Sequence, residues 1–291
     1  MPPGDEHCVL RSDMEINLGD ERIVELLAAY SPEQVQEMAL AKRADVFGQV
    51  VKLIQRPKLE DVEITATQKR LEPFWFAAAT ARYVYDRRHA YTVEAPPEVR
   101  SVTINGTDLA TIGERSHWFQ LEAIDHCVEE FRRELILEAM HGQEADLSKY
   151  LNYPHQTAPD MAALEQGGVM VVLPEVRGSF VVRKLVALLM KTFQADRIDE
   201  ERIDVEQVTL FFRPVYAIEY LWKPKQKKQV MEFDALTGEF RAEAGDIKKH
   251  VRRVLDNDAL FDIGADAIGT VLPGANVAIK LGRLAARKAV R

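Results

Sequence analysis

Hydrophobic and polar residues alternate in two stretches of the chain, and each stretch contains a proline followed by apolar and aromatic residues. The first stretch includes Leu-Glu-Pro-Phe-Trp-Phe-Ala at residues 71–77, and the second includes Phe-Arg-Pro-Val-Tyr-Ala at residues 212–217. Strict alternation predicts β-strands with one buried face, and a proline inside such a pattern suits a strand start or a bulge. The two strings lie about 140 residues apart, which is the size of a domain rather than of a solenoid repeat. The pattern therefore predicts two related modules.

Helical spacing precedes each alternating stretch. The segment from Ser31 to Gln34 has the features of a helix start, with serine at the N-cap, proline at the first helical position and glutamine at the capping-box position. We expect this helix to end before Pro57, because the residue before a proline disfavours helix. Apolar residues at helical spacing predict the matching helix of the second module at 180–193. A further short helix is expected at 21–29.

An antiparallel meander is predicted after each helix. Residues 86–89 and 223–228 are basic and are expected to form hairpin tips, and Asn105-Gly106 is a strong turn signal. Between the two modules, the apolar residues from Trp118 to Met140 predict one long amphipathic helix. Its expected end is His141-Gly142, because glycine commonly terminates a helix.

These elements predict an α+β fold with two related modules, each a helix packed on an antiparallel sheet of three or four strands. A helical insert joins the modules, and a helical C-terminal tail follows them. The expected boundaries are 1–30 for an N-terminal arm with a short helix, 31–110 for the first module, 111–168 for the insert, 169–245 for the second module and 246–291 for the tail.

Phe-Asp-Ala-Leu-Thr-Gly-Glu at 233–239 resembles the final hairpin of PepSY domains. Within this string the aspartate side chain can cap the turn, and glycine supplies the positive φ of a tight reversal. A helix packed on an antiparallel meander is also similar to the cystatin-like fold, and the sequence leaves both resemblances open. The PepSY resemblance implies a module that binds or inhibits peptidases, usually in an exported or membrane-linked protein. The longer string at 195–217 is similar to an uncharacterised bacterial family, which implies no activity.

Charge is distributed unevenly along the chain. The 291 residues carry a net charge of −8, which argues against a general nucleic-acid binder because such a protein needs a basic surface. Residues 251–291 are the exception, with seven Lys or Arg and four Asp, a balance of +3. In the helix predicted from residue 275 onward, basic side chains lie at spacings of three and four on one face: Lys280, Arg283, Arg287 and Arg291.

A basic amphipathic helix of this kind suits an anionic membrane surface or a protein partner. Packing of the tail on its own chain or on a homodimer mate is the alternative. The sequence shows no secretory signal and no apolar stretch long enough to cross a bilayer. Cys8 and Cys127 do not form a disulfide framework, so reduced thiols are expected. The predicted location is cytoplasmic, with peripheral membrane contact through the tail.

No motif for catalysis, cofactor binding or metal binding is found in the sequence. His117, His126, Cys127 and His141 lie at spacings of nine, one and fourteen, which do not place ligands on one helix face. No glycine-rich phosphate loop and no nucleophile motif is present. We therefore expect no catalytic residue, no cofactor and no metal.

The features that stand out from a plain core are the aromatic strings, the basic tips and the basic tail. The alternatives are burial in the core for the aromatic residues and ordinary solvated loops for the tips. The candidate interaction residues are Trp75, Tyr83, Arg87, Arg88, Tyr216, Tyr220, Trp222, Lys225, Lys227, Lys228, Lys280, Arg283, Arg287 and Arg291.

The sequence thus predicts a non-enzymatic binding or scaffold protein whose partner is another protein or a second copy of the chain. The competing prediction is a small-ligand-binding protein or an enzyme that uses a cleft between the two modules. An enclosed polar pocket with converging histidines or carboxylates would favour the competing prediction, and a filled interface would favour the first.

Overall fold

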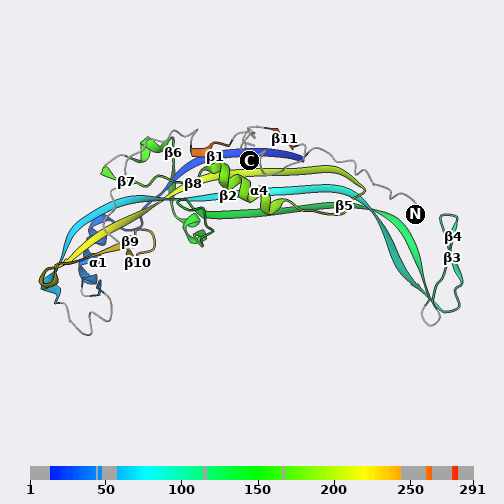
Figure 1. Cartoon of the computed structure of the whole chain (residues 1–291), viewed down its shortest axis with the longest axis horizontal. Helices are drawn as coiled ribbons and strands as arrows, with labels where there is room; N and C mark the ends of the chain where they lie inside the picture. Colours follow the sequence, from blue (N-terminus) through cyan, green and yellow to red (C-terminus); the bar gives the residue numbers. More distant parts are fainter. Residues whose placement is uncertain are drawn as a thin grey trace, which may run out of the picture.

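A computed structural model describes residues 14–43, 45–47, 58–113, 117–165, 168–243, 260–263 and 277–280. A nine-stranded mixed sheet contains most of the strands, and it forms a long arch (Figure 1). Its strands are β1 (Met14–Leu26), β2 (Val62–Ala95), β5 (His117–Glu138), β6 (His155–Ala158), β7 (Met170–Val171), β8 (Arg197–Trp222), β9 (Lys227–Asp234), β10 (Phe240–Glu243) and β11 (Val277–Lys280).

Smaller elements lie on and beyond this sheet. β3 (Ser101–Ile104) and β4 (Thr107–Ala110) form a separate hairpin at one end of the arch (Figure 1). The helices are α1 (Pro32–Lys42), α3 (Met161–Leu164) and α4 (Gly178–Leu189), with 3₁₀ turns η1 (Leu59–Asp61), η2 (Ser148–Asn152) and η4 (Lys223–Lys225). None of the helices in the described part of the chain has the length and apolar character needed to span a membrane.

The expected α+β pair of modules is wrong, because one sheet runs through both of them. β2 and β8, which contain the two proline strings, are direct antiparallel neighbours along the middle of the arch. β5 follows the concave side of the arch, and β1 and β11 follow the convex side (Figure 1). The two similar strings therefore pair with each other instead of building separate units.

Three of the expected elements are also corrected. Residues 118–140, predicted as a helix, form β5, because pairing with β2 uses a two-residue alternation that the helical spacing concealed. Residues 86–89 form no hairpin tip, since β2 continues straight through them with β5 beside it. In place of the helix expected at 21–29, residues 21–26 form the second half of β1 and residues 27–29 follow it as a loop.

Short capping and turn motifs predicted the structure better than the long hydrophobic patterns did. α1 begins at the predicted capping box, in which Ser31 Oγ accepts from the Gln34 N–H at 3.3 Å and the Ser31 N–H donates to Gln34 Oε1 at 2.8 Å. The Asn105-Gly106 turn joins β3 to β4 with φ values of 48° and 82°. The first helix is shorter than expected, because α1 ends at Lys42 with Arg43 as its C-cap and residues 45–47 form a turn. The helix expected from residue 275 is also corrected, since residues 277–280 form β11, which pairs with β1. The tail beyond residue 280 lies outside the described residues.

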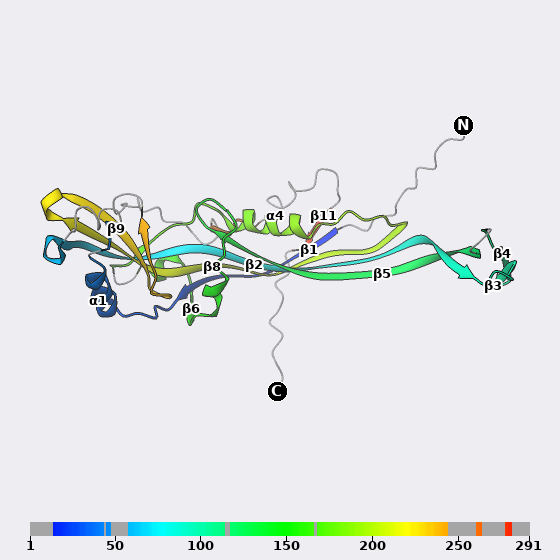
Figure 2. The ribbon, with the colours of Figure 1, turned by 90° about the horizontal axis from the view of Figure 1, so that it is seen from below.

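Helices α4 and α1 cover the same face of the long strands at two places. Trp75 of β2 and Leu185 of α4 belong to one buried cluster, and Tyr220 of β8 packs with Val35 of α1 in another. Because the sheet twists, the two helices come to lie on opposite sides of the ribbon in Figure 2. The other face is covered by η2, whose Tyr150 packs on Phe74.

Both prolines lie where the outer neighbour of their strand changes. Pro73 stands between the β2 residues that pair with β7 and those that pair with β5 from Phe74 onward. Pro214 stands between the β8 residues that pair with β1 up to Phe212 and those that pair with β9 from Val215 onward. A proline has no N–H to donate. Each proline therefore lies at a position where an N–H would find no acceptor on a neighbouring strand.

A buried polar network lies between the two prolines. Arg213 Nη2 donates to Glu72 Oε2 at 2.6 Å, and Arg213 Nη1 donates to Asp234 Oδ2 at 3.2 Å. The Tyr150 hydroxyl also donates to Asp234 Oδ2. Asp234 Oδ1 accepts from the N–H groups of Leu236 and Thr237 at 2.9 and 3.2 Å, which is the predicted turn cap. Gly238 of that turn has the expected positive φ, 77°. β2, β8, η2 and the turn after β9 are thus joined at one point.

We predict that Tyr150→Phe destabilises the fold by about 1–2 kcal/mol at neutral pH, because Asp234 loses one buried donor but keeps Arg213. Burial, followed by the bond to Asp234, raises the pKa of Tyr150 to about 12. This protonated form stabilises the fold below pH 10, the ordinary pKa, and the contribution is lost as the pH rises through about 12. The difference between wild type and variant should therefore shrink across this range in urea unfolding curves.

Tyr153→Phe, in the turn after η2, is the matched control. A wild type and a Tyr150→Phe variant whose unfolding free energies stay parallel from pH 8 to pH 12 would contradict the assignment.

Candidate interaction surface

Among the described residues, the outer edge of β5 has backbone partners only at its two ends. On its inner side, β5 pairs with β2 without interruption from Ala95 opposite His117 to Phe74 opposite Glu138. On its outer side, Trp118 exchanges two hydrogen bonds with Ile112, with N···O distances of 3.0 and 2.7 Å.

At the other end, the Glu138 N–H donates to the Gln143 carbonyl at 3.0 Å. The Ile136 carbonyl accepts from the Ala145 N–H at 3.3 Å. The free part of the edge therefore lies between Trp118 and Ile136.

These end bonds identify which residues of β5 point outward. In an antiparallel ladder the N–H and C=O groups of successive residues alternate between the two sides, and residues 118, 136 and 138 all use the outer side. The even-numbered residues between them point the same way, and within the described ranges no backbone group pairs with them: Gln120, Glu122, Ile124, His126, Val128, Glu130, Arg132 and Glu134. At about 3.3 Å per residue this open ladder is about 45 Å long.

Several of the usual protections against edge pairing are missing from β5, although it carries charged side chains. Lysine, proline, bulges and covering segments are the common ways to blunt an edge, and residues 117–138 contain no lysine, proline or glycine. The pairing of β5 with β2 also has no bulge, whereas that of β2 with β8 has three register shifts.

On the convex side, β11 covers Met14 to Asn17 of β1, and β6 covers Ile23 to Leu26. One long edge is therefore protected, and the other is open.

Most carboxylates along the open edge are held by side chains of their own chain, and Glu122 is the exception among the described contacts. Asp125 accepts from the Tyr91 hydroxyl at 2.6 Å and from Arg87 at 3.1 Å, and these bonds, led by that of Tyr91, lower the pKa of Asp125. Lys191 and then Tyr85 likewise lower the pKa of Glu129.

On the other face, Glu130 pairs with Arg82 at 3.0 Å. In the middle of the edge, the side chains that these bonds leave unengaged include the aliphatic Ile124 and Val128.

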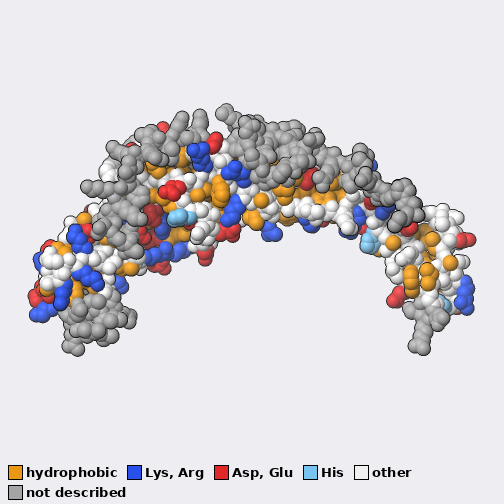
Figure 3. Space-filling model, in the orientation of Figure 1, with side chains coloured by type: hydrophobic (Ala, Val, Ile, Leu, Met, Phe, Trp, Pro, Cys, Tyr) orange, Lys and Arg blue, Asp and Glu red, His pale blue; other side chains and the backbone are white. Residues whose placement is uncertain are grey.

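Two aliphatic side chains in the middle of β5 are strongly exposed. Ile124 is 57% exposed and Val128 is 59% exposed, on the face opposite α4. On the α4 face, Leu121 and Phe131 are half-buried. In Figure 3 hydrophobic side chains show at the surface along the arch and on the arm that carries β3 and β4. The edge thus combines free backbone groups with apolar side chains on both faces.

The aromatic members of the predicted interaction set are core residues. Trp75, Tyr83, Tyr216, Tyr220 and Trp222 are all buried. Three of them are also satisfied by backbone oxygens: Trp75 Nε1 donates to the Val176 carbonyl at 2.9 Å, the Tyr83 hydroxyl to Leu189 at 2.9 Å and the Tyr220 hydroxyl to Ala39 at 3.0 Å. They shape the sheet and present no face to a partner.

The basic members lie far apart in the sheet. Arg87 and Arg88 are on β2, beyond the start of β8, where Arg87 holds Asp125 of β5. Lys225, Lys227 and Lys228 lie at the opposite end of β8, and Lys228 pairs with Glu219 at 3.0 Å. Lys280 ends β11, and Arg283, Arg287 and Arg291 lie outside the described residues.

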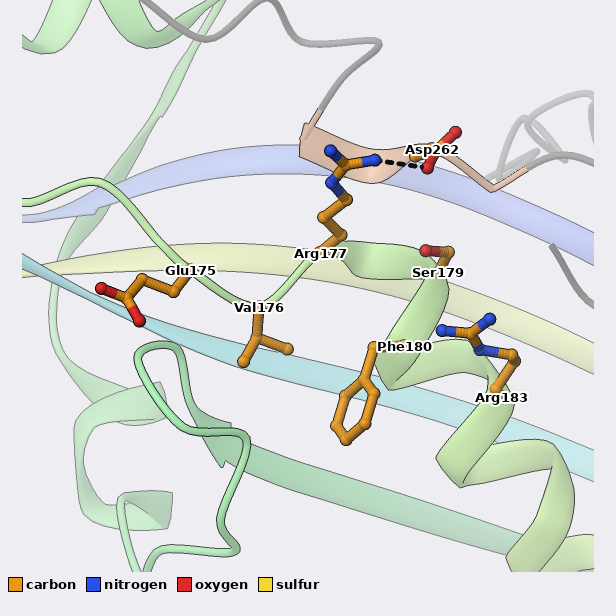
Figure 4. A pocket seen from close by; sticks show the side chains of 7 residues that line it. All are labelled: Glu175, Val176, Arg177, Ser179, Phe180, Arg183 and Asp262. Carbon is orange, nitrogen blue, oxygen red and sulfur yellow. Dashed lines mark hydrogen bonds and ion pairs between the residues drawn. The ribbon is translucent and has the colours of Figure 1, made fainter. Parts of the chain in front are cut away.

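A hollow next to α4 offers no comparable chemistry. Its lining residues are Glu175, Val176, Arg177, Ser179, Phe180, Arg183 and Asp262 (Figure 4). Arg177 and Asp262 neutralise each other across it at 2.8 Å. Within the described ranges no three His, Cys, Asp or Glu side chains are grouped as a metal site requires.

The chain matches no family model, no curated protein and no solved structure in the comparisons made with each. The open edge of β5 is therefore the candidate site. The sequence interpretation missed this edge, although a signal for it was present. Seven of the ten alternate positions from 119 to 137 are apolar, the exceptions being Asp125, Glu129 and Arg133, and the stretch has no lysine, proline or glycine.

We predict an alternating pattern of amide hydrogen exchange along β5 in the isolated protein. Inward amides such as those of Cys127 and Phe131 should be protected by β2, and outward amides such as those of Ile124 and Val128 should exchange much faster. Residue-resolved exchange by NMR measures this directly. Equal protection of odd and even positions from 120 to 134 would show that another segment covers the edge.

Proposed function

We propose that the chain is a non-enzymatic binding protein that takes up an extended segment of a partner protein along the outer edge of β5. The observation that carries the proposal is the open ladder from Gln120 to Glu134. Addition of a strand to an exposed sheet edge is a common mode of peptide recognition, in which main-chain hydrogen bonds supply affinity and side-chain contacts supply specificity.

The shape of the molecule supports an extended partner. β5 follows the concave side of the arch (Figure 1), so a single added strand can lie along it while the arch surrounds the strand. α4 and the long strands give this edge a rigid backing, because Tyr83 and Leu185 behind it are fully buried. The binding surface is thus preformed, which lowers the entropy lost when a partner docks.

The described residues give less support to a catalytic function than to a binding function. The expected alternative needed a cleft between two modules, but the two proline strings pair directly within one sheet. The hollow beside α4 is open to solvent, and two of its charged residues, Arg177 and Asp262, neutralise each other. A cytoplasmic location stays part of the proposal, supported by the free thiol of Cys127 on β5.

The proposal predicts different effects for two substitutions of one residue. Val128→Pro removes an outward N–H but no hydrogen bond to β2, whereas Val128→Ala keeps the N–H and removes only the side chain. The full chain, with a photo-cross-linking residue in place of Ile124, is incubated with an extract of the native host. We expect Val128→Pro to reduce the cross-linked partner about tenfold and Val128→Ala to reduce it far less.

Support for the proposal is the difference between these two variants, not the capture of a protein as such. Circular dichroism and thermal unfolding of both variants control for folding. Equal cross-linking by the two variants would contradict strand addition, as would a cross-link that stays unchanged in both.

A further inference from the structure

The unsatisfied chemistry along β5 also indicates what kind of segment the edge accepts. This inference rests on the proposed function. Asp125, Glu129 and Glu130 are each engaged within the chain, by Tyr91 and Arg87, by Lys191 and Tyr85, and by Arg82. A partner therefore gains little by bringing basic residues to the middle of the edge.

The middle of the edge instead favours apolar residues on both faces of the added strand. Ile124 and Val128 are more than half exposed on one face, and Leu121 and Phe131 are half-buried on the other. Cross-strand neighbours lie about 5 Å apart, so an added strand places its own side chains directly beside these four. β-Branched residues pack best on such a pleated surface.

Two charged side chains of the edge have no ion pair within the described part of the chain. Glu122 lies near one end of the apolar stretch, and Arg133 lies just beyond the other. The Arg133 guanidinium lies 6.0 Å from the centre of the Phe131 ring, where it remains exposed. An added strand that pairs with both charges therefore needs a basic residue opposite Glu122 and an acidic residue opposite Arg133.

We propose that the segment accepted by β5 is an apolar, β-branched strand of another protein, with an acidic residue opposite Arg133 and a basic residue opposite Glu122. The strand runs antiparallel to β5, as β2 does on the inner side, because antiparallel pairing is the more stable arrangement. Its acidic residue then lies toward its N-terminus, and its basic residue lies toward its C-terminus.

A second copy of the chain is the competing occupant. Two β5 strands paired around Phe131 would bring Glu129 and Glu130 opposite Arg133 and Arg132. That pairing is short, because Ile136 already uses its outward carbonyl for Ala145. β5 also follows the inner side of the arch, so the downturned ends of two copies would meet before their β5 edges (Figure 1). The structure therefore favours a separate, extended segment.

Two synthetic peptides about 14 residues long test the proposal. Both have the same alternating valine and threonine core. The first has glutamate near its N-terminus and lysine near its C-terminus, and the second has the two exchanged. Binding of each labelled peptide to the full chain is measured by fluorescence anisotropy. We expect the first to bind about threefold more tightly, as a partly exposed ion pair at each end allows.

Arg133→Glu should remove or reverse this preference, and the matched control Arg22→Glu, on β1 at the opposite edge of the sheet, should leave it unchanged. Val128→Pro should weaken both peptides about tenfold. Equal binding of the two peptides, a preference that survives Arg133→Glu, or no binding at all would overturn the partner chemistry. None of these results alters the host cross-linking result, which decides the proposed function separately.

Sedimentation equilibrium of the wild type and of Val128→Pro tests whether a second copy of the chain pairs with the β5 edge. A monomer in both supports the proposal. A wild-type dimer that Val128→Pro dissociates would overturn it in favour of self-pairing through β5.

Discussion

The arch depends on one junction between its two longest strands, and the ion pair between Arg213 and Glu72 stabilises this junction. It links β2 to β8 at the place where both strands exchange their outer neighbours, between the two prolines. Removing Glu72 would leave the half-buried Arg213 with Asp234 as its remaining partner, whereas removing Arg213 would take the shared cation from both carboxylates, which costs more than the net gain of the pair suggests. Asp234 and Tyr150 share the same site and bring η2 and the β9 turn to it. The junction therefore fixes the register of the two longest strands.

Long strands in a fixed register have a consequence for the edges of the sheet. β2 extends beyond the start of β8, and β5 accompanies it along that arm. Among the described strands, only β2 pairs with β5, so no strand covers its outer side. Because β5 is long, its open outer edge is long as well. The candidate surface follows from the length of β2, and no special local motif is needed to create it.

Local sequence signals predicted local structure well, because their physics is contained in a few residues. The capping box at Ser31 and the turn at Asp234 are each closed by bonds within a short segment. β5 could not be recognised in this way. Its apolar residues fit helical spacing and two-residue alternation alike, and pairing with β2, more than twenty residues away, decides between the two. The similarity of the two proline strings was real, but it reflects antiparallel neighbours at one junction instead of repeated modules.

An open apolar edge is a liability unless something limits its pairing. Unblunted edges promote association between identical chains, and the exposed Ile124 and Val128 increase that tendency. The arch itself supplies a limit, because a flat edge of another arch cannot reach along the concave side over a long stretch, whereas a single flexible strand can (Figure 1). Selectivity against copies of the chain then comes from curvature, and selectivity among peptides comes from side chains. This division explains how an edge without lysine or proline can be kept for a partner.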